Sequence, residues 1–521
     1  MKLRNQPRPD VAAPTRRANT VDLRTVSPEP TATALLTEAQ AREFCAIPLA
    51  LQGNTVLVAI AQPDGPTVAA LREALGRPVN VALADRADIL ATIGRTYRAL
   101  TGIEQQVRAF EARDSIRRDT KADTPAAASD DAPVVHVVSL MITQALRDRA
   151  SDVHLEPQAD RLRIRYRIDG VLHDVLDLPG SMGPAVASRI KILGGMNIVE
   201  RRRPQDGQIS MEVEGRPVDI RVASTPVIGG EKVVLRLLDK SRPLFRLPQL
   251  GMPEAMAARY SAVLQSPYGM VICAGPTGSG KTTTLYGSLG ELDSAERNIM
   301  TIEDPVEYTM ARVNQIQINE QAGVTFSGGL KSILRQDPDV ILVGEVRDAD
   351  TARIAVQSAL TGHFVLSSLH ATDAASALHR LLDMGIENFL VASSVTAVLS
   401  QRLVRRMCLH CREYFEPSAQ ERAFLASLGA DGPPGGFVHG AGCNFCAHTG
   451  FLDRIGVYEL MPITDSLRAL VLRSASHREI HELARREGMR TLQDEALRLV
   501  TDGVTTPAEI LRSIYLTGGA R

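Results

Sequence analysis

One short stretch constrains this chain of 521 residues more than any other. It runs from Gly275 to Thr282, reads GPTGSGKT, and fits the phosphate-binding pattern G-x-x-x-x-G-K-S/T. The apolar run Met270–Ala274 before it is typical of a buried parallel strand, and Thr282–Leu292 after it predicts a helix. A glycine-rich turn between such a strand and such a helix aims backbone N–H groups at an anion. The sequence therefore predicts a nucleotide site in an α/β domain.

The residues predicted to bind the nucleotide belong to this loop and to the start of the helix. They are Gly275, Pro276, Thr277, Gly278, Ser279, Gly280, Lys281, Thr282 and Thr283. We expect Lys281 to meet the β- and γ-phosphates of ATP, and the Thr282 hydroxyl to hold Mg²⁺. A chance match is a weak alternative, because a strand precedes the loop and a helix follows it.

Two other apolar runs lead into carboxylates. Asn298–Glu303 predicts a short strand that ends at Glu303, and Asp339–Val343 predicts a second strand, followed by Gly344 and Glu345. In an open α/β sheet, the carboxyl ends of the strands line the ligand crevice. Both carboxylates are therefore predicted to be catalytic, with Glu345 orienting the metal-bound or attacking water. An exposed strand-end carboxylate is the alternative for each, and Glu307 is left undecided.

A third apolar run, Gly362–Leu369, has a histidine near each end. His370 follows the end that is expected to face the nucleotide, so it is predicted to sense the phosphate state. His363 is equally well explained as a structural residue.

Arginines gather in the segment before the phosphate loop. Arg161–Ile168 alternates strictly and places four arginines on one strand face, where Arg161 and Arg163 are best explained as a solvated surface. Arg221 and Arg236 lie in two further strands. Phosphoryl transfer needs one or two cations at the γ-phosphate, so both are candidates for that role, and the sequence leaves the choice between them open.

Composition bounds the partners. The formal net charge is −1, aromatic residues make up 4% of the chain and tryptophan is absent, so we expect no nucleic acid partner. The first residues lack the apolar core of a signal peptide, and no run of about 18 apolar residues occurs. We expect a cytoplasmic protein that reaches the membrane through a partner.

Periodicity and composition also divide the chain. Residues 1–30 predict a disordered arm and the charged, then Ala-, Asp- and Ser-rich stretch 101–133 a linker. The predicted folded parts are a small α/β domain for docking at 31–100, a second α/β domain at 134–240, and a nucleotide-binding domain at 241–521 that includes a cysteine module at 403–450 and a helical end.

Four of the six cysteines form two C-x-x-C pairs, separated by roughly 31 residues. The ligands would be Cys408, Cys411, Cys443 and Cys446. In a reducing compartment such pairs indicate a metal rather than disulfides. Four thiolates leave zinc no open position, so we expect a structural zinc ion.

Together these motifs resemble the secretion ATPases that drive type II secretion and type IV pilus assembly. The resemblance runs from about residue 134 to the end. It rests on the phosphate loop, Thr301–Glu307, Leu334–Asp339 with Gly344–Asp348, Gly362–His370, Ser151–Pro157, Arg202–Gly207 and the cysteine module.

The resemblance implies a RecA-like P-loop NTPase motor domain, a preceding PAS-like α/β domain, and a homo-hexameric ring with ATP bound between the two domains of each chain. It also implies roles for Arg221 and Arg236 at the nucleotide, Arg335 as a further phosphate-side arginine and Glu345 as the catalytic carboxylate. Lys331 stands where the family often has arginine. The N-terminal domain would dock on inner-membrane platform proteins; the cyclic-dinucleotide motif of some members is not evident here.

Two other functions are alternatives for a chain with these motifs. A RecA-like translocase on nucleic acid would need a basic groove and stacking aromatics, which the composition disfavours. A nucleotide-gated scaffold with little turnover is disfavoured by the intact Glu345.

Overall fold

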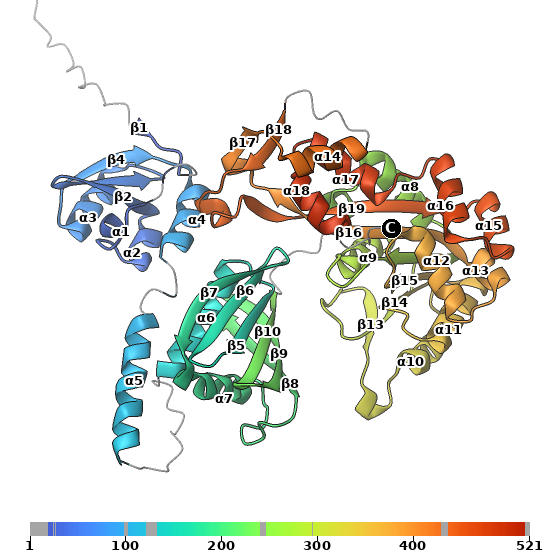
Figure 1. The fold of residues 1–521 in the computed structure, drawn as a ribbon, viewed down its shortest axis with the longest axis horizontal. Helices are drawn as coiled ribbons and strands as arrows, with labels where there is room; N and C mark the ends of the chain where they lie inside the picture. The colour runs from blue at the N-terminus through green and yellow to red at the C-terminus, as the bar shows by residue number, and fades with distance from the viewer. Residues whose placement is uncertain are drawn as a thin grey trace, which may run out of the picture.

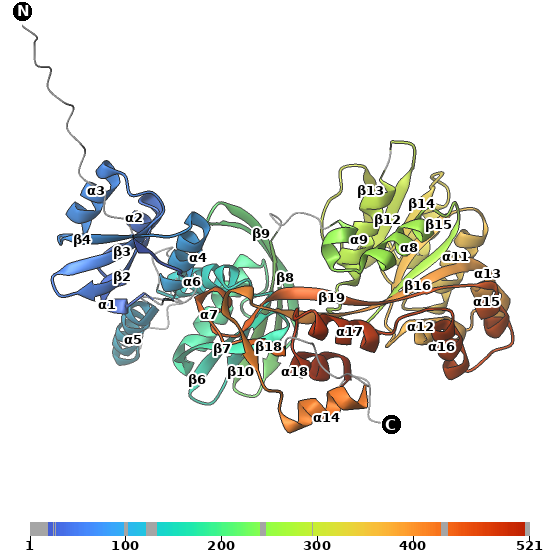
Figure 2. The same cartoon turned by 90° about the horizontal axis from the view of Figure 1, so that it is seen from above.

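The computed structural model describes residues 19–23, 26, 28–97, 100, 103–120, 133–239, 246–293, 295–428 and 436–515. The described strands form sheets of four, six, seven and two strands. The three larger sheets follow one another along the chain, as the colours of Figures 1 and 2 show. Among the described residues, no helix is both long and apolar enough to cross a membrane.

The N-terminal sheet has the order β1-β4-β3-β2, with only the β2–β3 pair antiparallel. Its elements are β1 (Asn19–Thr20), α1 (Pro30–Thr33), α2 (Glu38–Glu43), β2 (Ala46–Gln52), β3 (Thr55–Ile60), α3 (Gly65–Leu75), β4 (Val79–Leu83) and α4 (Arg86–Thr96). Part of the predicted arm is therefore ordered, which corrects the expectation. The reason is that Val21 N–H donates to Leu83 O, at 2.9 Å, and the side chain of Leu23 is fully buried. Residues 1–18 lie outside the described residues.

The predicted linker also contains regular structure. It forms α5 (Ile103–Thr120), while 121–132 lie outside the described residues. Ile103 is buried in the core of the next domain, and Val107 and Phe110 pack against that core. Ile103, Val107 and Phe110 are spaced about one helical turn apart and so share one face of α5. Packing of this apolar face stabilises a helix in a segment that is mostly charged.

The second sheet is antiparallel throughout, in the order β7-β6-β5-β10-β9-β8. Its elements are α6 (Pro133–Arg147), β5 (Asp152–Pro157), β6 (Arg161–Ile168), β7 (Val171–Pro179), η1 (Gly180–Met182), α7 (Gly183–Leu193), β8 (Gln205–Val213), β9 (Arg216–Val227) and β10 (Gly230–Asp239). Leu162, Ile164 and Tyr166 of β6 are buried, so its arginines share the opposite face, as predicted. Arg161 and Arg163 pair there with Asp177 and Asp174 of β7.

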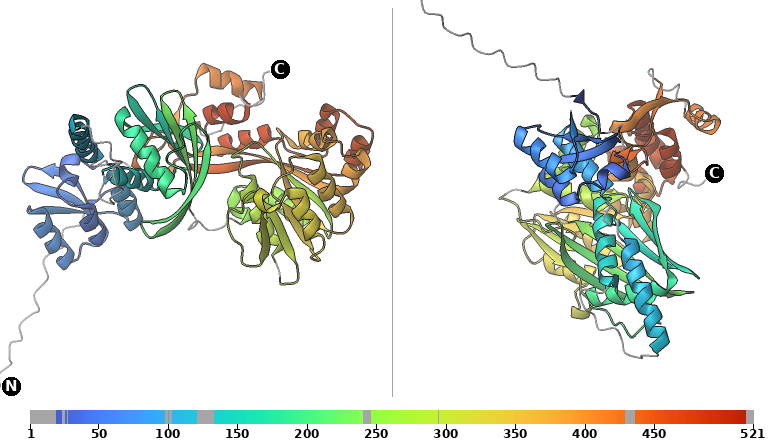
Figure 3. Two further views of the ribbon diagram at one scale, coloured as in Figure 1. Left: turned by 90° about the horizontal axis from the view of Figure 1, so that it is seen from below. Right: turned by 90° about the vertical axis from the view of Figure 1, so that its left-hand side faces the viewer.

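Arg147 joins the first two domains. Its Nη1 donates to Tyr97 O, at 2.8 Å, and to Glu38 Oε2, at 3.2 Å, both in the N-terminal domain. It also pairs with Glu214, in the turn between β8 and β9. The views from below and from the side show the N-terminal domain beside the second sheet and the seven-stranded sheet beyond it (Figure 3).

The seven-stranded sheet has the order β13-β12-β14-β15-β11-β16-β19, and only the edge strand β19 is antiparallel. Its strands are β11 (Gly269–Ala274), β12 (Ile299–Glu303), β13 (Val313–Gln317), β14 (Val340–Val343), β15 (Phe364–Leu369), β16 (Val395–Met407) and β19 (Phe451–Pro462). Alternate residues of β11 enter two apolar clusters, so the sheet lies between two helical layers.

One layer contains η2 (Leu247–Leu250), α8 (Glu254–Leu264) and α9 (Lys281–Leu292). The other contains α10 (Phe326–Ile333), α11 (Ala349–Leu360), α12 (Ala374–Asp383), α13 (Asn388–Ser394), α15 (Asp465–Leu472) and α16 (His477–Arg486). Between β16 and β19 the chain forms η4 (Leu409–Cys411), β17 (Arg412–Phe415), α14 (Ala419–Ser427), β18 (Phe437–Gly440) and η5 (Asn444–Cys446). The remaining elements are η3 (Glu320–Ala322), α17 (Leu492–Thr501), α18 (Pro507–Ile510) and η6 (Leu511–Tyr515).

Candidate functional site

The predicted site residues follow the carboxyl ends of adjacent parallel strands. The phosphate loop follows β11, Glu345 comes two residues after β14, and His370 comes directly after β15. These three strands are neighbours in the order β14-β15-β11, and β12, which ends at Glu303, lies next to β14. The strand ends therefore meet along one edge of the sheet, where open α/β sheets bind their ligands.

The loop has the backbone shape that a phosphate cradle needs. Gly275, Gly278 and Gly280 have φ values of 157°, 75° and 89°, which L side chains rarely adopt. A Cβ atom at Gly275 would lie 2.5 Å from Ser279 Oγ, so only glycine fits there. The Ser279 hydroxyl is buried and has no hydrogen-bond partner among the described residues, as expected for a loop whose polar groups serve a ligand.

Lys281 is the first residue of α9 and bends back over the loop. Its Nζ donates to Gly275 O, at 2.9 Å, and to Pro276 O, at 3.1 Å. Burial lowers the pKa of Lys281 below its ordinary value, and the neighbouring Cys273 and Glu345 offset only part of this shift. Pro276, Thr277, Gly278, Thr282 and Thr283 are exposed.

Glu345, Arg347 and His370 form a polar cluster beside the loop. Glu345 pairs with Arg347, and His370 Nε2 lies 3.7 Å from Glu345 Oε2. Arg347 Nη1 also lies 3.4 Å from Asp304 Oδ2. Partial burial lowers the pKa of His370, and the charge of Lys281 lowers it further, so its imidazole is neutral near pH 7.

Glu303 has different surroundings, although it ends a neighbouring strand. Its carboxylate is buried and accepts hydrogen bonds from Tyr286 at 2.5 Å, Thr301 at 2.6 Å and Gln315 at 3.3 Å. Three donors therefore hold it inside the fold. Glu345, in contrast, keeps 19% of its side chain exposed and faces Lys281 and His370.

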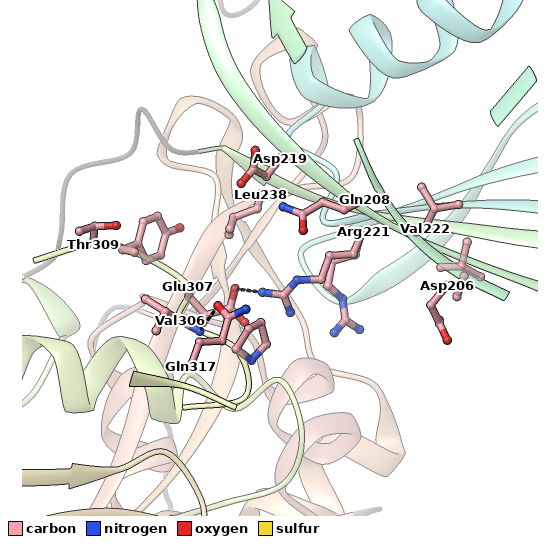
Figure 4. Close-up of a pocket in the computed structure, with 16 residues that line it drawn as sticks. Asp206, Gln208, Asp219, Arg221, Val222, Leu238, Val306, Glu307, Thr309 and Gln317 are labelled. Carbon is pink, nitrogen blue, oxygen red and sulfur yellow. Dashed lines mark hydrogen bonds and ion pairs between the residues drawn. The ribbon is translucent and has the colours of Figure 1, made fainter. Parts of the chain in front are cut away.

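The second sheet faces this edge across a cavity of about 1150 Å³, lined by β8, β9 and β10 on one side and Pro305–Thr309 on the other. Arg221 spans it, because its Nη2 lies 2.8 Å from Glu307 Oε2 (Figure 4). Arg236 lines the same cavity, and its Nε lies 3.2 Å from Asp152 Oδ1.

Arg236 also lines a second cavity, of about 620 Å³, together with Pro276, Thr277 and Gly278. Arg335 is exposed at the end of α10, where its Nη1 donates to Lys331 O at 3.0 Å. The structure thus brings Lys281, Glu345 and His370 together, places Arg221 and Arg236 on the facing wall, and leaves Arg335 on the surface.

Sequence reasoning assigned no role to Arg347, Gln401 or Arg402. Arg347 lies in the motif Gly344–Asp348, two residues after Glu345. That spacing could have predicted an ion pair between the two side chains. Gln401 and Arg402 are more than a hundred residues from the phosphate loop, and Gln401 contacts it only because β16 pairs with β11.

The four predicted cysteine ligands also come together. Their sulfur atoms lie within 4.8 Å of one another, and the Cys408–Cys443, Cys411–Cys446 and Cys443–Cys446 pairs are each 3.8 Å apart. A zinc tetrahedron with Zn–S bonds of about 2.3 Å has edges of about 3.8 Å. All six cysteines are free thiols, so the cluster does not consist of disulfides.

Backbone N–H groups surround these thiols. Gly442 N–H donates to Cys411 Sγ at 3.3 Å, and Gly450 N–H donates to Cys446 Sγ at 3.2 Å. Donors of this kind favour thiolates. The donor set and its spacing therefore fit a four-coordinate soft metal ion.

Known proteins share this sequence and this fold. The sequence model of the type II/IV secretion system protein family matches residues 127–512, and that of the MshEN domain matches residues 14–103. The chain is 42% identical over 475 residues to the type II secretion system protein E of Xanthomonas campestris pv. campestris, covering 90% of this chain and 83% of that protein. It is 40% identical over 499 residues to the type IV pilus assembly ATPase PilB of Myxococcus xanthus, covering 94% and 88%.

The fold has a solved counterpart as well. The ATPase DotB of Legionella pneumophila superposes with a TM-score of 0.55 at 20% identity, over 76% of this chain and 98% of that one. At that identity the likeness concerns the fold alone. On the strength of the family match and of the two sequence relatives, the chain belongs to the type II/IV secretion system protein family.

Proposed function

We propose that this chain is an ATPase motor that hydrolyses ATP to ADP and phosphate and powers type II protein secretion or type IV pilus assembly. The observation that carries the proposal is the meeting of Lys281, Glu345 and His370 along one sheet edge, beside a glycine-shaped loop. Its relatives are named for the same two machines.

In this proposal the loop amides and Lys281 hold the β- and γ-phosphates, and Glu345 orients the attacking water. Mg²⁺, when bound with ATP, would neutralise phosphate charge, and the Thr282 hydroxyl and nearby carboxylates are the oxygen ligands it prefers. Arg347, which now pairs with Glu345, must release it for this role.

The arginines across the cavity would serve the same step. Arg236 lines a cavity together with the phosphate loop, so it needs the smaller movement to reach a phosphate. Arg221 must first leave Glu307. Closure of the second domain on the nucleotide would make that exchange, since a γ-phosphate carries more charge than one carboxylate.

The chain would work as a homo-hexameric ring. Val199 and Ile228 of the second domain are 84% and 102% exposed, and a neighbouring subunit would cover such apolar side chains in the ring. Arg335, on the outer surface, would then act at a neighbouring subunit's nucleotide.

The N-terminal domain, which matches the MshEN domain, would dock on inner-membrane platform proteins and hold a cytoplasmic ring at the membrane. The four cysteines would bind one structural zinc ion. No observation favours a nucleic acid substrate, and the semi-exposed Glu345 beside Lys281 favours turnover over a static scaffold.

Glu345→Gln tests the catalytic assignment. The amide keeps the shape but lacks the negative charge that polarises the attacking water, so Mg²⁺-dependent ATP hydrolysis should fall by about two orders of magnitude or more. Binding of a fluorescent ATP analogue should persist. Glu254→Gln, on the exposed first turn of α8, is the matched control and should hydrolyse ATP normally. Near-normal turnover of Glu345→Gln would refute the assignment.

A further inference from the structure

Gln401 lies on β16, directly behind the phosphate loop. β16 runs parallel to β11, with Ala274 opposite Ser400, so the next residue of β16 lies beside the loop itself. The side chain of Gln401 is 1% exposed. Its Nε2 donates to Ser279 O at 2.7 Å, and its Oε1 accepts from the Cys273 thiol at 3.2 Å. One amide thus bridges the strand before the loop and the end of the loop.

The glycines of the loop also contact Gln401. A Cβ atom at Gly275 would lie 2.7 Å from Gln401 O, and one at Gly280 would lie 3.2 Å from Gln401 Nε2. The loop therefore packs against this residue at both ends. Its glycines give it unusual backbone freedom, so outside contacts must select the phosphate-binding shape.

Arg402, the next residue, reaches a different loop. Its side chain is largely buried, and its Nη2 donates to Thr372 O at 2.7 Å, while Nη1 donates to Gln401 O at 3.1 Å. Thr372 lies two residues after His370. The guanidinium group therefore holds the segment that carries His370, and a planar fork with several donors suits two carbonyl acceptors better than an ammonium group.

We propose that Gln401 and Arg402 are positioning residues for ATP hydrolysis. Gln401 holds the phosphate loop in its binding shape, and Arg402 holds the His370 segment in register with that loop. The inference rests on the proposed ATPase function, which it deepens. Because the two residues are adjacent, one strand sets the relative positions of the group that binds phosphate and the group that faces Glu345.

The first test is Gln401→Met, which keeps the approximate shape of the side chain and removes its N–H donor. The loop then samples shapes that do not fit phosphate, and ordering it again on binding costs affinity. We expect the Kd for a fluorescent ATP analogue with Mg²⁺ to rise about tenfold, while kcat at saturation stays within about threefold of wild type. Gln357→Met, at an exposed position of α11, is the control and should change neither value.

Arg402→Lys tests whether Arg402 holds the His370 segment in place for hydrolysis. It keeps the charge but not the two-carbonyl fork, so we expect kcat to fall about tenfold with the Kd unchanged. One variant would thus change the Kd alone and the other kcat alone. A merely structural role for these adjacent residues would not separate binding from turnover in this way.

Hydrogen exchange separates positioning from general stability. In Gln401→Met, exchange should rise in residues 275–281 while β14 and β15 stay protected; equal loosening of the whole sheet would overturn the proposal. If Gln401→Met does not fold, Gln401→Glu, which also removes the donor, is measured in the same way. An unchanged Kd in either variant contradicts the inference for Gln401. Wild-type protein without hydrolysis would instead contradict the proposed function.

Discussion

At the scale of single residues, His477 links two helices of the motor domain. It begins α16, and its Nε2 lies 2.9 Å from Oδ1 of Asp373, the N-cap of α12. The hydrogen bond to Asp373 raises the pKa of His477 above its ordinary value of 6.5. The ring of His481 stacks on that of His477 with the centroids 5.8 Å apart. The neighbouring Glu459 is buried, which raises its own pKa to about 7.

This contact predicts a pH dependence of stability. A raised folded-state pKa contributes stability that is complete below the unfolded pKa and is lost as the pH rises through the folded pKa. The wild type should therefore melt about 1 to 2 °C above His477→Gln at pH 6, with the gap closing towards about pH 9. Heating curves followed by circular dichroism measure it.

Asp373→Asn provides the matched comparison. An amide can still cap α12 but no longer holds an imidazolium, so this variant should lose the same pH-dependent part. A gap between wild type and His477→Gln that is constant from pH 6 to pH 9 would contradict the explanation.

Glu303 and Glu345 show how far residue patterns reach. Both follow apolar strands, and both were predicted to be catalytic. Their surroundings separate them, because Tyr286 and Thr301 hold Glu303 in the interior while Glu345 faces Lys281. No pattern in the sequence distinguishes the two, since Tyr286 lies on α9 and meets Glu303 only when the helix packs on the sheet.

At the scale of elements, the two cysteine pairs hold together a small module with little core of its own. Phe445 is buried among the four cysteines, and the ring of His410 stacks on it with the ring centroids 4.2 Å apart. The two-stranded sheet of β17 and β18 and the helix α14 lie between the pairs. Leu425 of α14 and Val438 of β18 are buried as well. A metal ion would supplement this small apolar core.

We therefore predict about one zinc ion per chain in purified protein. Cys443→Ser should reduce the zinc content to less than about half an ion per chain and expose the remaining thiols to titration. Cys45→Ser, in the buried N-terminal core, is the control and should leave zinc unchanged. Elemental analysis and thiol titration measure both. Wild-type protein with little zinc and four freely titrating module thiols would rule out the zinc site.

The segments α5 and β1 show what element prediction from composition misses. Charged and proline-rich stretches resemble linkers, yet short apolar sets within them pack on a neighbouring domain. Val107, Phe110 and Leu23 do so here. Burial against a partner surface, not local composition, stabilises these elements.

At the scale of the whole molecule, the three larger sheets are joined by a few polar contacts. Arg147 connects the N-terminal domain to the second domain. Arg221 connects the second domain to the domain of the seven-stranded sheet, through Glu307. Both the side chain of Arg221, 35% exposed, and that of Glu307, 30% exposed, remain open to solvent. Such contacts are weak enough to break during a nucleotide cycle.

A ring completed by neighbouring subunits must lose activity on dilution. We expect Mg²⁺-dependent ATP hydrolysis per chain to rise steeply with protein concentration, in parallel with hexamer measured by sedimentation. Val199→Asp, which replaces an exposed apolar side chain of the second domain by a charge, should move the rise to higher concentration. Flat, substantial activity from protein that sediments as a monomer would exclude a shared site.

Local sequence patterns predicted many features of this protein. The phosphate loop, the carboxylates after apolar strands and the paired cysteines each depend on residues a few positions apart, whose covalent spacing limits where they can lie. Tertiary packing settled the rest. The bridge from Gln401 to Ser279, the pairing of Arg221 with Glu307 and the burial of Glu303 join residues distant in the chain. Such contacts depend on how strands pair and helices pack, and no local pattern records that.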